Sequence, residues 1–475
     1  MKKLLSKATA YLLALAVILG MGSWPAVSMP VMAAEGSVVN VYDATTLGEM
    51  LKTENVDIVL WQDINYTGSD KVVCNSIDLN GHDLTCSKTL TFDSGKRTVR
   101  ILDSQYQSTS SNTATFSKGI YINDGTLRIE SGIISVYYGC TDDGKDLTER
   151  LSGGIHGKGN VEFINGKITV RGDSFSVQEA INGKDGKPGG EKGGNGYYGG
   201  TGGNGGIGTD GHGLNGPGGN GGNGGNGCYG SFGGDGNPGI NVANVFIQGG
   251  DIAIQGCNGG NGGNGGTGGD GNPGGNGGNG GNGDSGGDGI LATTVTVCGG
   301  NVSVNGGTGG NGGNGGRSGA YYHGILSSSG GTGGNGGTGG DGIQATNVTI
   351  YSGNVIVHGG AGGHGGEVGH GKTSGYGGIG GNSGNGIQAT NVTIYDGNVT
   401  VHGESGGRGG SFGLVDNEGN RIGGSNGFGG AGIHAALIVE GGAVTASGGS
   451  YSAGIGGSGN GSGLNGFDVT ISGGQ

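Results

Sequence analysis

The sequence has little proline, little charge and no basic run, and each shortage excludes a class of protein. Proline supplies only 6 of 475 residues although glycine supplies 133, whereas collagen needs abundant proline with glycine at every third position. Charged residues make up 12% of the chain and the net charge is −13. An acidic chain of this kind is a poor partner for nucleic acid or for anionic lipid. We therefore expect no nucleic acid among its partners.

Cysteine and long apolar runs are also scarce. The six cysteines form no C-x-x-C pair and lie beside no histidines at ligand spacing, so the sequence predicts no zinc site. Their pairing stays open, because exported proteins form disulfides and buried free cysteines are common. After the N-terminal segment, no stretch is apolar over the ~20 residues that a membrane helix needs. We expect no membrane insertion.

The N-terminus is typical of a targeting segment. Three lysines in the first seven residues form a basic start, an apolar run follows over residues 11–21, and small residues close the segment at Ala33 and Ala34. This order is that of a secretory signal peptide over residues 1–34, and its apolar run is too short to span a bilayer. We expect a secreted protein or one on the extracellular surface.

A recurring unit fills much of the remaining chain. Weaker copies begin at Gly119, Gly154 and Gly432. Self-similarity of this kind is typical of a solenoid or a propeller. The full copies are GINVANVFIQGGDIAIQG from Gly239, GILATTVTVCGGNVSVNG from Gly289, GIQATNVTIYSGNVIVHG from Gly342 and GIQATNVTIYDGNVTVHG from Gly386.

Apolar residues alternate within each unit. Turn residues separate the apolar pairs, so each unit is predicted to be three short strands with bends between them. Stacking the units ~4.8 Å apart buries an apolar face that no single unit buries alone. A sandwich needs hairpin turns and a propeller blade needs four strands, so we predict an all-β fold of the β-helix (solenoid) type. In the third full copy the apolar pairs are Ile343 and Ala345, Val348 and Ile350, and Val355 and Val357.

The N-terminal region supports this fold. Residues 35–118 are predicted to form a cap and the first rungs, with Thr46 and Glu49 as a capping box for a short helix over the open end. The segments IDLNGHDL at 77–84 and YSAGIGG at 451–457 resemble bacterial surface proteins of the pectate-lyase-like superfamily. That resemblance implies a right-handed parallel β-helix but little about activity, because the fold hosts many functions.

Glycine-rich tracts interrupt the rungs of residues 119–475. Two glycines are followed by Asn, Thr or Asp in a constant phase of three. A helix of the polyproline-II type has three residues per turn, so the third residues would form one column and leave two all-glycine faces for close backbone contact. We predict polyglycine-II-like insertions, which resemble the bundles of snow-flea antifreeze proteins and phage tail adhesins; a flexible linker is the alternative. The main tracts cover residues 183–238, 258–288, 305–341, 359–385 and 403–431.

Aromatic and histidine side chains are candidate binding residues. Tyr321, Tyr322 and Tyr376 lie near predicted tips of the tracts, where aromatic rings are suited to stacking on sugars. His358 and His402 occupy the same place in neighbouring copies, and we expect them to stack as an exterior ladder. A pH-sensitive pair or a metal site is the alternative for these two histidines.

Asp288 and Asp341 are candidate metal ligands. Residues 336–344 fit the calcium-binding nonapeptide GGxGxDxUx, and residues 283–291 come close to it. Such calcium sites form between tandem nonapeptides, whereas these two segments are far apart in the sequence. The alternative is that both aspartates shape the turn from tract to strand. Beyond calcium we expect no cofactor.

The motifs of an enzyme are incomplete. Asp142-Asp143 and Gly211-His212-Gly213 appear in the order that polygalacturonase-like enzymes use, but their Asn-x-Asp and Arg-x-Lys elements are missing. The sequence favours a secreted or cell-surface adhesin-like binding or structural protein that contacts extracellular glycans, or a host or cell surface, through loops of the glycine-rich insertions. A polysaccharide-active β-helix enzyme and an ice-associated or matrix structural protein are the alternatives.

Overall fold

Parallel β-strands make up nearly all the regular structure of this protein. The computed structural model describes residues 36–138, 154–172, 236–270, 275–320, 328–372, 375–411, 423–457 and 468–473. Within these ranges the one α-helix is α2 (Ala44–Leu51). No helix in the described part of the chain is both long and apolar enough to cross a membrane. The segment predicted as a signal peptide lies outside the described residues.

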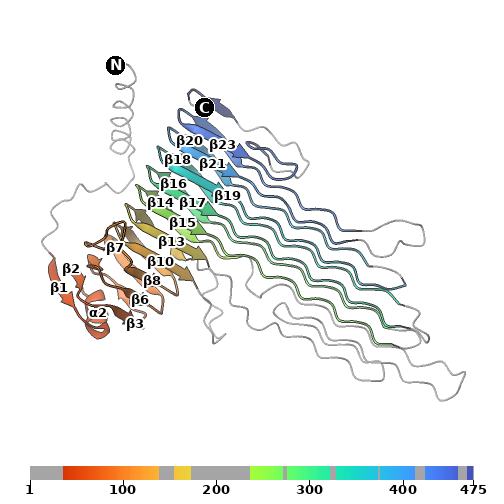
Figure 1. The fold of residues 1–475 in the computed structure, drawn as a ribbon, viewed down its shortest axis with the longest axis horizontal. Helices are drawn as coiled ribbons and strands as arrows, with labels where there is room; N and C mark the ends of the chain where they lie inside the picture. Colours follow the sequence, from red (N-terminus) through yellow and green to blue (C-terminus); the bar gives the residue numbers. More distant parts are fainter. Residues whose placement is uncertain are drawn as a thin grey trace, which may run out of the picture.

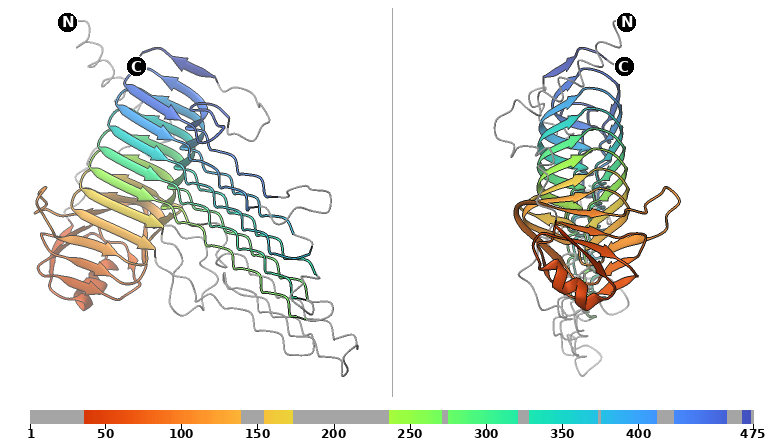
Figure 2. Two further views of the ribbon diagram at one scale, coloured as in Figure 1. Left: turned by 45° about the vertical axis from the view of Figure 1, so that its right-hand side comes forward. Right: turned by 90° about the vertical axis from the view of Figure 1, so that its left-hand side faces the viewer.

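Two long sheets form the walls of a right-handed parallel β-helix (Figure 1, Figure 2). The first has the spatial order β1 (Ser37–Val41), β2 (Val56–Leu60), β5 (Ser76–Asp78), β7 (Leu90–Leu102), β9 (Ile120–Ile129), β11 (Ile155–Gly157), β14 (Ile240–Ile247), β16 (Ile290–Val297), β18 (Ile343–Ile350), β20 (Ile387–Ile394), β22 (Ile433–Val439) and β24 (Val469–Ile471), with β4 (Lys71–Val72) and β12 (Asn160–Phe163) beside this path. The second has the order β3 (Ile64–Tyr66), β6 (Leu84–Cys86), β8 (Thr113–Phe116), β10 (Ile133–Tyr138), β13 (Lys167–Gly172), β15 (Asp251–Gln255), β17 (Asn301–Asn305), β19 (Asn354–His358), β21 (Asn398–His402) and β23 (Ala443–Ser447).

The inward side chains of the two sheets form one continuous apolar core. Val348 and Ile350 from β18, and Val355 and Val357 from β19, are at most 1% exposed. Each stacks on its equivalent in the next rung, because β18 pairs with β20 and β19 with β21 in parallel register. Burying one face of every strand fixes this register, since a slip of one residue would turn the apolar set outward. The predicted β-helix with a shared apolar stack is confirmed.

The first two predicted strands of each unit are one bent strand. In β18 the pairing with β16 skips Thr346 and then resumes, so the strand continues through the expected turn. The inward positions Ala345 and Val348 are three residues apart instead of two, which places the bend between them. The expected three strands per unit are therefore two, because the residues on either side of the bend keep their ladder bonds.

The N-terminal helix packs on the first rung but begins earlier than predicted. Its N-cap is Asp43, whose carboxylate accepts hydrogen bonds from the Thr46 backbone N–H at 2.8 Å and from the Thr46 hydroxyl at 2.9 Å. The predicted capping box is wrong, because Thr46 is the third helical residue and donates to the cap. Leu47 and Leu51 are buried against the first strands, at the end of the solenoid where Figure 2 shows the helix.

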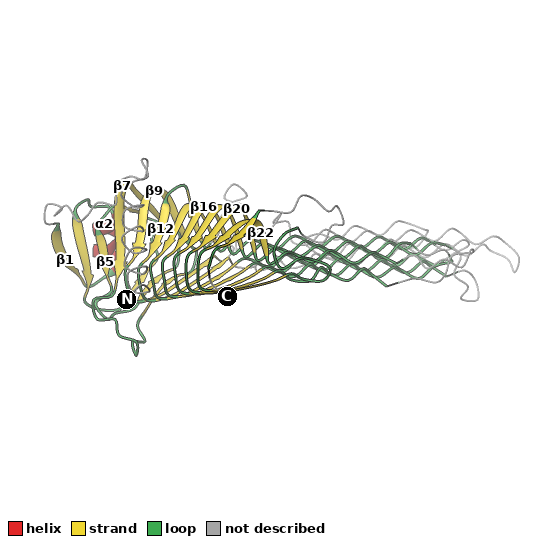
Figure 3. Ribbon diagram, turned by 90° about the horizontal axis from the view of Figure 1, so that it is seen from above, coloured by secondary structure: helices red, strands yellow, loops and turns green. Residues whose placement is uncertain are grey.

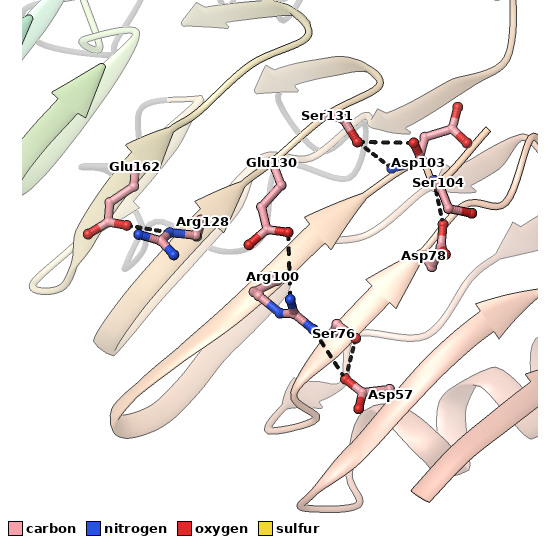
Figure 4. Close-up of polar contacts among 10 residues, drawn as sticks. All are labelled: Asp57, Ser76, Asp78, Arg100, Asp103, Ser104, Arg128, Glu130, Ser131 and Glu162. Atoms are coloured by element: carbon pink, nitrogen blue, oxygen red, sulfur yellow. Dashed lines mark hydrogen bonds and ion pairs between the residues drawn. The ribbon is translucent and has the colours of Figure 1, made fainter. Parts of the chain in front are cut away.

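The outer face of the first sheet carries ion pairs at its N-terminal end. Figure 4 shows Arg100 between Asp57 and Glu130, with N···O distances of 3.7 and 3.6 Å, and Arg128 bound to Glu162 at 2.7 Å. Of these residues, Arg128 and Glu162 lie opposite each other on neighbouring strands, which favours the register there, although exposed pairs contribute only about 0.2–1 kcal/mol each. Towards the C-terminus the same column is uncharged and continues as Phe246, Thr296, Thr349 and Thr393.

The glycine tracts leave the second sheet, run away from the solenoid and return to the first sheet. Figures 1 and 3 show them as long limbs lying side by side, and we call this assembly the glycine bundle. The outgoing limbs are residues 256–270, 306–320, 359–372 and 403–411, and the returning limbs are residues 275–289, 328–342, 375–386 and 423–432.

Candidate functional site

The glycine bundle consists of two hydrogen-bonded layers. Within a tract the two limbs are antiparallel, as where the Gly281 N–H donates to the Gly263 carbonyl at 2.8 Å. Limbs of successive tracts are parallel, as where the Gly262 N–H donates to the Asn311 carbonyl at 2.7 Å. The outgoing limbs therefore form one layer and the returning limbs form the other. The predicted polyglycine-II-like insertions are ordered by this network.

All three N–H groups of a triplet find acceptors, which explains why the third residue is so often asparagine. In residues 312–314 the first glycine donates to the His364 carbonyl, and the second donates across the layers to the Gly281 carbonyl, both at 2.7 Å. The third N–H donates to the side-chain oxygen Oδ1 of Asn264 in the preceding tract at 2.8 Å. The amide oxygen of Asn264 thus supplies an acceptor for the next limb and stabilises it.

The two glycines of a triplet such as residues 312–314 leave no room for a side chain. A Cβ atom on Gly312 would lie 2.0 Å from the Gly334 carbonyl oxygen, and one on Gly313 would lie 2.0 Å from the Gly263 carbonyl oxygen. Real Cβ atoms do not approach oxygen so closely, and here backbone lies on both sides. The two all-glycine faces predicted from the sequence are therefore contact surfaces between limbs.

Replacing Asn311 by alanine should weaken the bundle locally. Its Oδ1 accepts from the His364 N–H at 2.8 Å, and losing a bond of this kind costs about 0.5–1.5 kcal/mol. Thr308→Ala is the matched control, because the Thr308 N–H is held by Asn258 Oδ1 whatever side chain Thr308 carries. Thermal denaturation of the two variants should show the larger loss for Asn311→Ala, and equal losses would contradict the acceptor role.

The third residues of the triplets point outward and form columns on two outer faces of the bundle. Asn261 and Asn264 are exposed on the outgoing face. On the returning face, three apolar side chains stand among the polar ones, and Tyr376, Ile379 and Phe428 are 60%, 50% and 43% exposed. From the sequence we named Tyr376 but missed Ile379 and Phe428. Counting triplets back from the following strand would have placed both at outward third positions.

The two candidate histidines stack on the outer face of the second sheet. The ring centroids of His358 and His402 lie 4.8 Å apart with an angle of 29° between planes. His358 Nδ1 lies 3.6 Å from a Glu404 carboxylate oxygen, and His402 Nδ1 is hydrogen-bonded to the Ser447 hydroxyl. The two rings therefore stack as the predicted exterior ladder. A role in binding stays a prediction.

The two candidate aspartates lie in one column where the returning limbs meet the first sheet. Asp288 Oδ1 accepts from the Asp341 N–H at 2.7 Å, and Asp341 Oδ1 accepts from the Asn385 N–H at 2.6 Å. Each carboxylate thus accepts a hydrogen bond from the backbone of the next rung at the turn from tract to strand. Within the described residues, no group of three or more His, Cys, Asp or Glu side chains is placed to hold a metal ion. The calcium site remains an untested prediction.

A polar groove of about 400 Å³ follows this corner, and we call it the corner groove. It crosses four successive rungs, from the start of β14 to the tract residues that precede β20. Glycine backbone and polar side chains line it together, with polar and apolar surface in about equal shares, and neither lysine nor arginine is among its lining residues. The polar side chains that line it include Asn241, Ser285, Asp288, Thr338, Asp341 and Gln344.

Asp341 should make stability depend on pH. Desolvation raises the pKa of its carboxyl group to about 6, although the hydrogen bonds from Asn385 favour the ionised form. Folding then favours the protonated acid, so this contribution to stability is complete below the unfolded pKa of about 4 and is lost as the pH rises through about 6.

Asp341→Asn should therefore stabilise the protein at neutral pH. An amide oxygen still accepts from the Asn385 N–H but carries no charge to desolvate, so the gain at about pH 7.5 should be on the order of 2 kcal/mol and should vanish near pH 4. Melting curves of wild type and variant at both pH values test this. The same difference at both would contradict it.

Several residues singled out from the sequence lie outside the described part of the chain. These are Tyr321 and Tyr322 among the binding candidates, the Asp142-Asp143 pair and His212. Four of the cysteines lie in the described part of the chain, Cys74, Cys86, Cys257 and Cys298, and Cys74, Cys86 and Cys298 form no disulfide there. Burial raises the pKa of Cys74 and Cys86 to about 12 and that of Cys298 to about 11, which leaves little reactive thiolate.

Comparisons of the chain with protein-family models, with curated proteins and with solved structures find no match.

Proposed function

We propose that the protein is an adhesin-like binding protein, secreted or held on the extracellular surface, that contacts glycans through its glycine bundle. The ligand would lie in the corner groove and on the outer faces of the bundle. Sugar hydroxyls pair with amide, hydroxyl and carboxylate groups, which are the groups that line the groove. A signal-peptide pattern at the N-terminus supports export.

The shape of the corner groove carries the proposal. Four rungs contribute to it, so at ~4.8 Å per rung it extends about 15 Å along the solenoid axis. A groove of this length suits an extended polymer with repeated hydroxyl groups. Because two aspartates and no basic residue line it, we expect it to favour neutral or cationic glycans over polyanionic ones.

Rigidity of the bundle favours binding. The limbs are already ordered by their backbone hydrogen bonds, so a ligand meets side chains held in fixed columns. Binding to a preorganised surface avoids the entropy that flexible glycine loops would lose. The polyglycine-II bundles of phage tail adhesins, which the tracts resemble in sequence, belong to proteins that bind cell surfaces.

A pair of arginine substitutions tests this function. Thr338 is exposed in the groove, whereas Thr308 is exposed at an outgoing limb of the same tract. Thr338→Arg places a bulky cation in the groove and should reduce retention on insoluble polysaccharides such as cellulose, chitin or xylan at least about tenfold. Thr308→Arg should bind like wild type.

Three outcomes would count against the proposal. Wild-type protein that is retained by no polysaccharide and no glycan array would contradict glycan binding. Equal binding by both arginine variants would show that the corner groove is not the binding site. Release of soluble sugars from the same polysaccharides would favour the enzyme alternative.

A further inference from the structure

Tyr42 and Trp61 form an exposed aromatic pair at the N-terminal end of the solenoid. Their ring centroids are 6.4 Å apart, and the ring planes are inclined by 34°. Tyr42 is 51% exposed and Trp61 is 50% exposed. Large aromatic side chains contribute most when buried, so two rings in contact that both leave half their surface in water point to a binding surface.

Rigid backbone holds the two rings. Each follows a core residue at the end of its strand, and these residues, Val41 and Leu60, are 0% exposed. The Trp61 N–H donates to the Val41 carbonyl at 3.0 Å, which fixes the two chain segments side by side. The rings therefore stand on adjacent rungs, each directly after the end of a paired strand.

The fold does not require aromatic side chains at this turn. In the rung after Trp61 the equivalent residue is Asn80, whose side-chain Nδ2 donates to the Leu60 carbonyl at 3.0 Å. A small polar residue thus serves the turn by bonding to the backbone. Tyr42 and Trp61 expose apolar surface where the next rung uses a capping amide.

Polar groups lie directly beside the rings in the sequence. Gln62 and Asp63 follow Trp61 and are exposed. Asp63 Oδ1 accepts from the Asp83 N–H at 3.0 Å and lies 3.3 Å from His82 Nδ1, so its position is fixed. Hydrogen bonding to the Asp83 N–H lowers the pKa of Asp63, which keeps the carboxylate ionised at neutral pH. A pyranose ring has an apolar face and equatorial hydroxyls, so it suits two exposed rings that an amide and a carboxylate residue follow directly in the chain.

We propose that Tyr42 and Trp61 are a stacking platform for pyranose rings of an extracellular glycan, with Gln62 and Asp63 beside it for the sugar hydroxyls. The inference rests on the proposed function and adds a second contact. In the first sheet, β5, β7, β9 and β11 separate this platform from the rungs of the corner groove.

The tryptophan content provides a direct test. The chain has two tryptophans, so the full chain with Trp24→Phe keeps only Trp61. Titration with soluble cellohexaose, chitohexaose and xylohexaose should give a saturable change in its fluorescence with at least one of them. Tyr42→Ala in the same background should weaken that binding roughly two- to tenfold.

Retention on insoluble polysaccharide gives the second readout. Trp61→Ala in the otherwise unchanged chain should lower retention by a similar factor. Tyr395→Ala is the matched control, since Tyr395 is another exposed ring, stacked on Tyr351 further along the solenoid, and should bind like wild type. Melting curves confirm that each variant is folded.

The outcomes separate this inference from the proposed function. Tyr42 precedes the N-cap of α2, so a purely structural role would lower the melting temperature of Tyr42→Ala and leave the Trp61 titration unchanged. That result, or full retention of Trp61→Ala on a polysaccharide that wild type binds, would overturn the platform while leaving the corner groove intact. A wild-type chain that binds no glycan would overturn both.

Discussion

Gly313→Ala is expected to break the packing of the glycine bundle. The new Cβ atom would lie 2.0 Å from the Gly263 carbonyl oxygen, and that oxygen belongs to backbone that is itself held between limbs. Relief requires the limbs to separate, which removes hydrogen bonds worth about 1 kcal/mol each in addition to 1–3 kcal/mol of overpacking. Limited proteolysis with a broad-specificity protease should cut within residues 306–320 and 328–342, where we expect wild type to resist cleavage.

The solenoid itself should survive this change. Its core lies in the strands, so the far-ultraviolet β signal should remain while the bundle opens. Gly457→Ala is the matched control, because a Cβ atom on Gly457 meets no atom within 4 Å. Wild-type resistance to protease in Gly313→Ala would mean that the limbs are not packed as described.

Phe163→Ala is expected to be the most destabilising single truncation in the middle of the solenoid. Phe163 lies in β12, points into the core and is 0% exposed. Truncating a buried phenylalanine costs about 3–5 kcal/mol, because the transfer term and the cavity term add. Each rung contacts chiefly its neighbours, so the loss should appear as a lower melting temperature or as early unfolding of the rungs around β12.

Phe246 provides the control for this truncation. It lies in β14, the strand next to β12, and pairs with Glu162 in the outward column. Phe246→Ala removes no core volume and should cost well under half as much as Phe163→Ala. A similar melting temperature for both variants would contradict the inward orientation of Phe163.

The rungs could be read from the sequence because a single physical pattern specifies them. Alternation of apolar residues fixes which face of each strand is buried, and the near-identical copies fix the register. Residues 343–357 therefore lie as predicted, apart from the bend at Thr346. The helix start was misjudged by one turn because Asp43 and Thr46 both suit an N-cap, and only the structure shows that Thr46 donates to Asp43.

It was harder to predict that the glycine tracts adopt a fixed structure. Ordering glycine costs up to about 2 kcal/mol per residue, and the tracts bury almost no apolar side chain. The constant phase of three predicted the glycine faces but not the role of the asparagines, which accept from limbs 44–53 residues further on. Stacked rungs hold successive limbs side by side, which lowers the entropy lost on assembly.

The corner groove could not be read from the sequence. Its walls join tract ends to strand starts of other rungs, so residues such as Asn241 and Ser383 come to line the same groove only through the stack. Likewise, Tyr42 and Trp61 look like ordinary strand-end aromatics until the register brings their rings together.

Amide hydrogen exchange across residues 256–342 tests the central claim most directly. The two-layer bundle holds the N–H groups of Gly281, Gly313 and Gly337 in bonds of 2.7–2.8 Å to neighbouring limbs. Peptides that contain them should exchange orders of magnitude more slowly than an unstructured chain, with protection approaching that of the strands β16 and β18. Exchange at the rate of an unfolded glycine-rich peptide, alongside protected strands, would show that the tracts are loose loops.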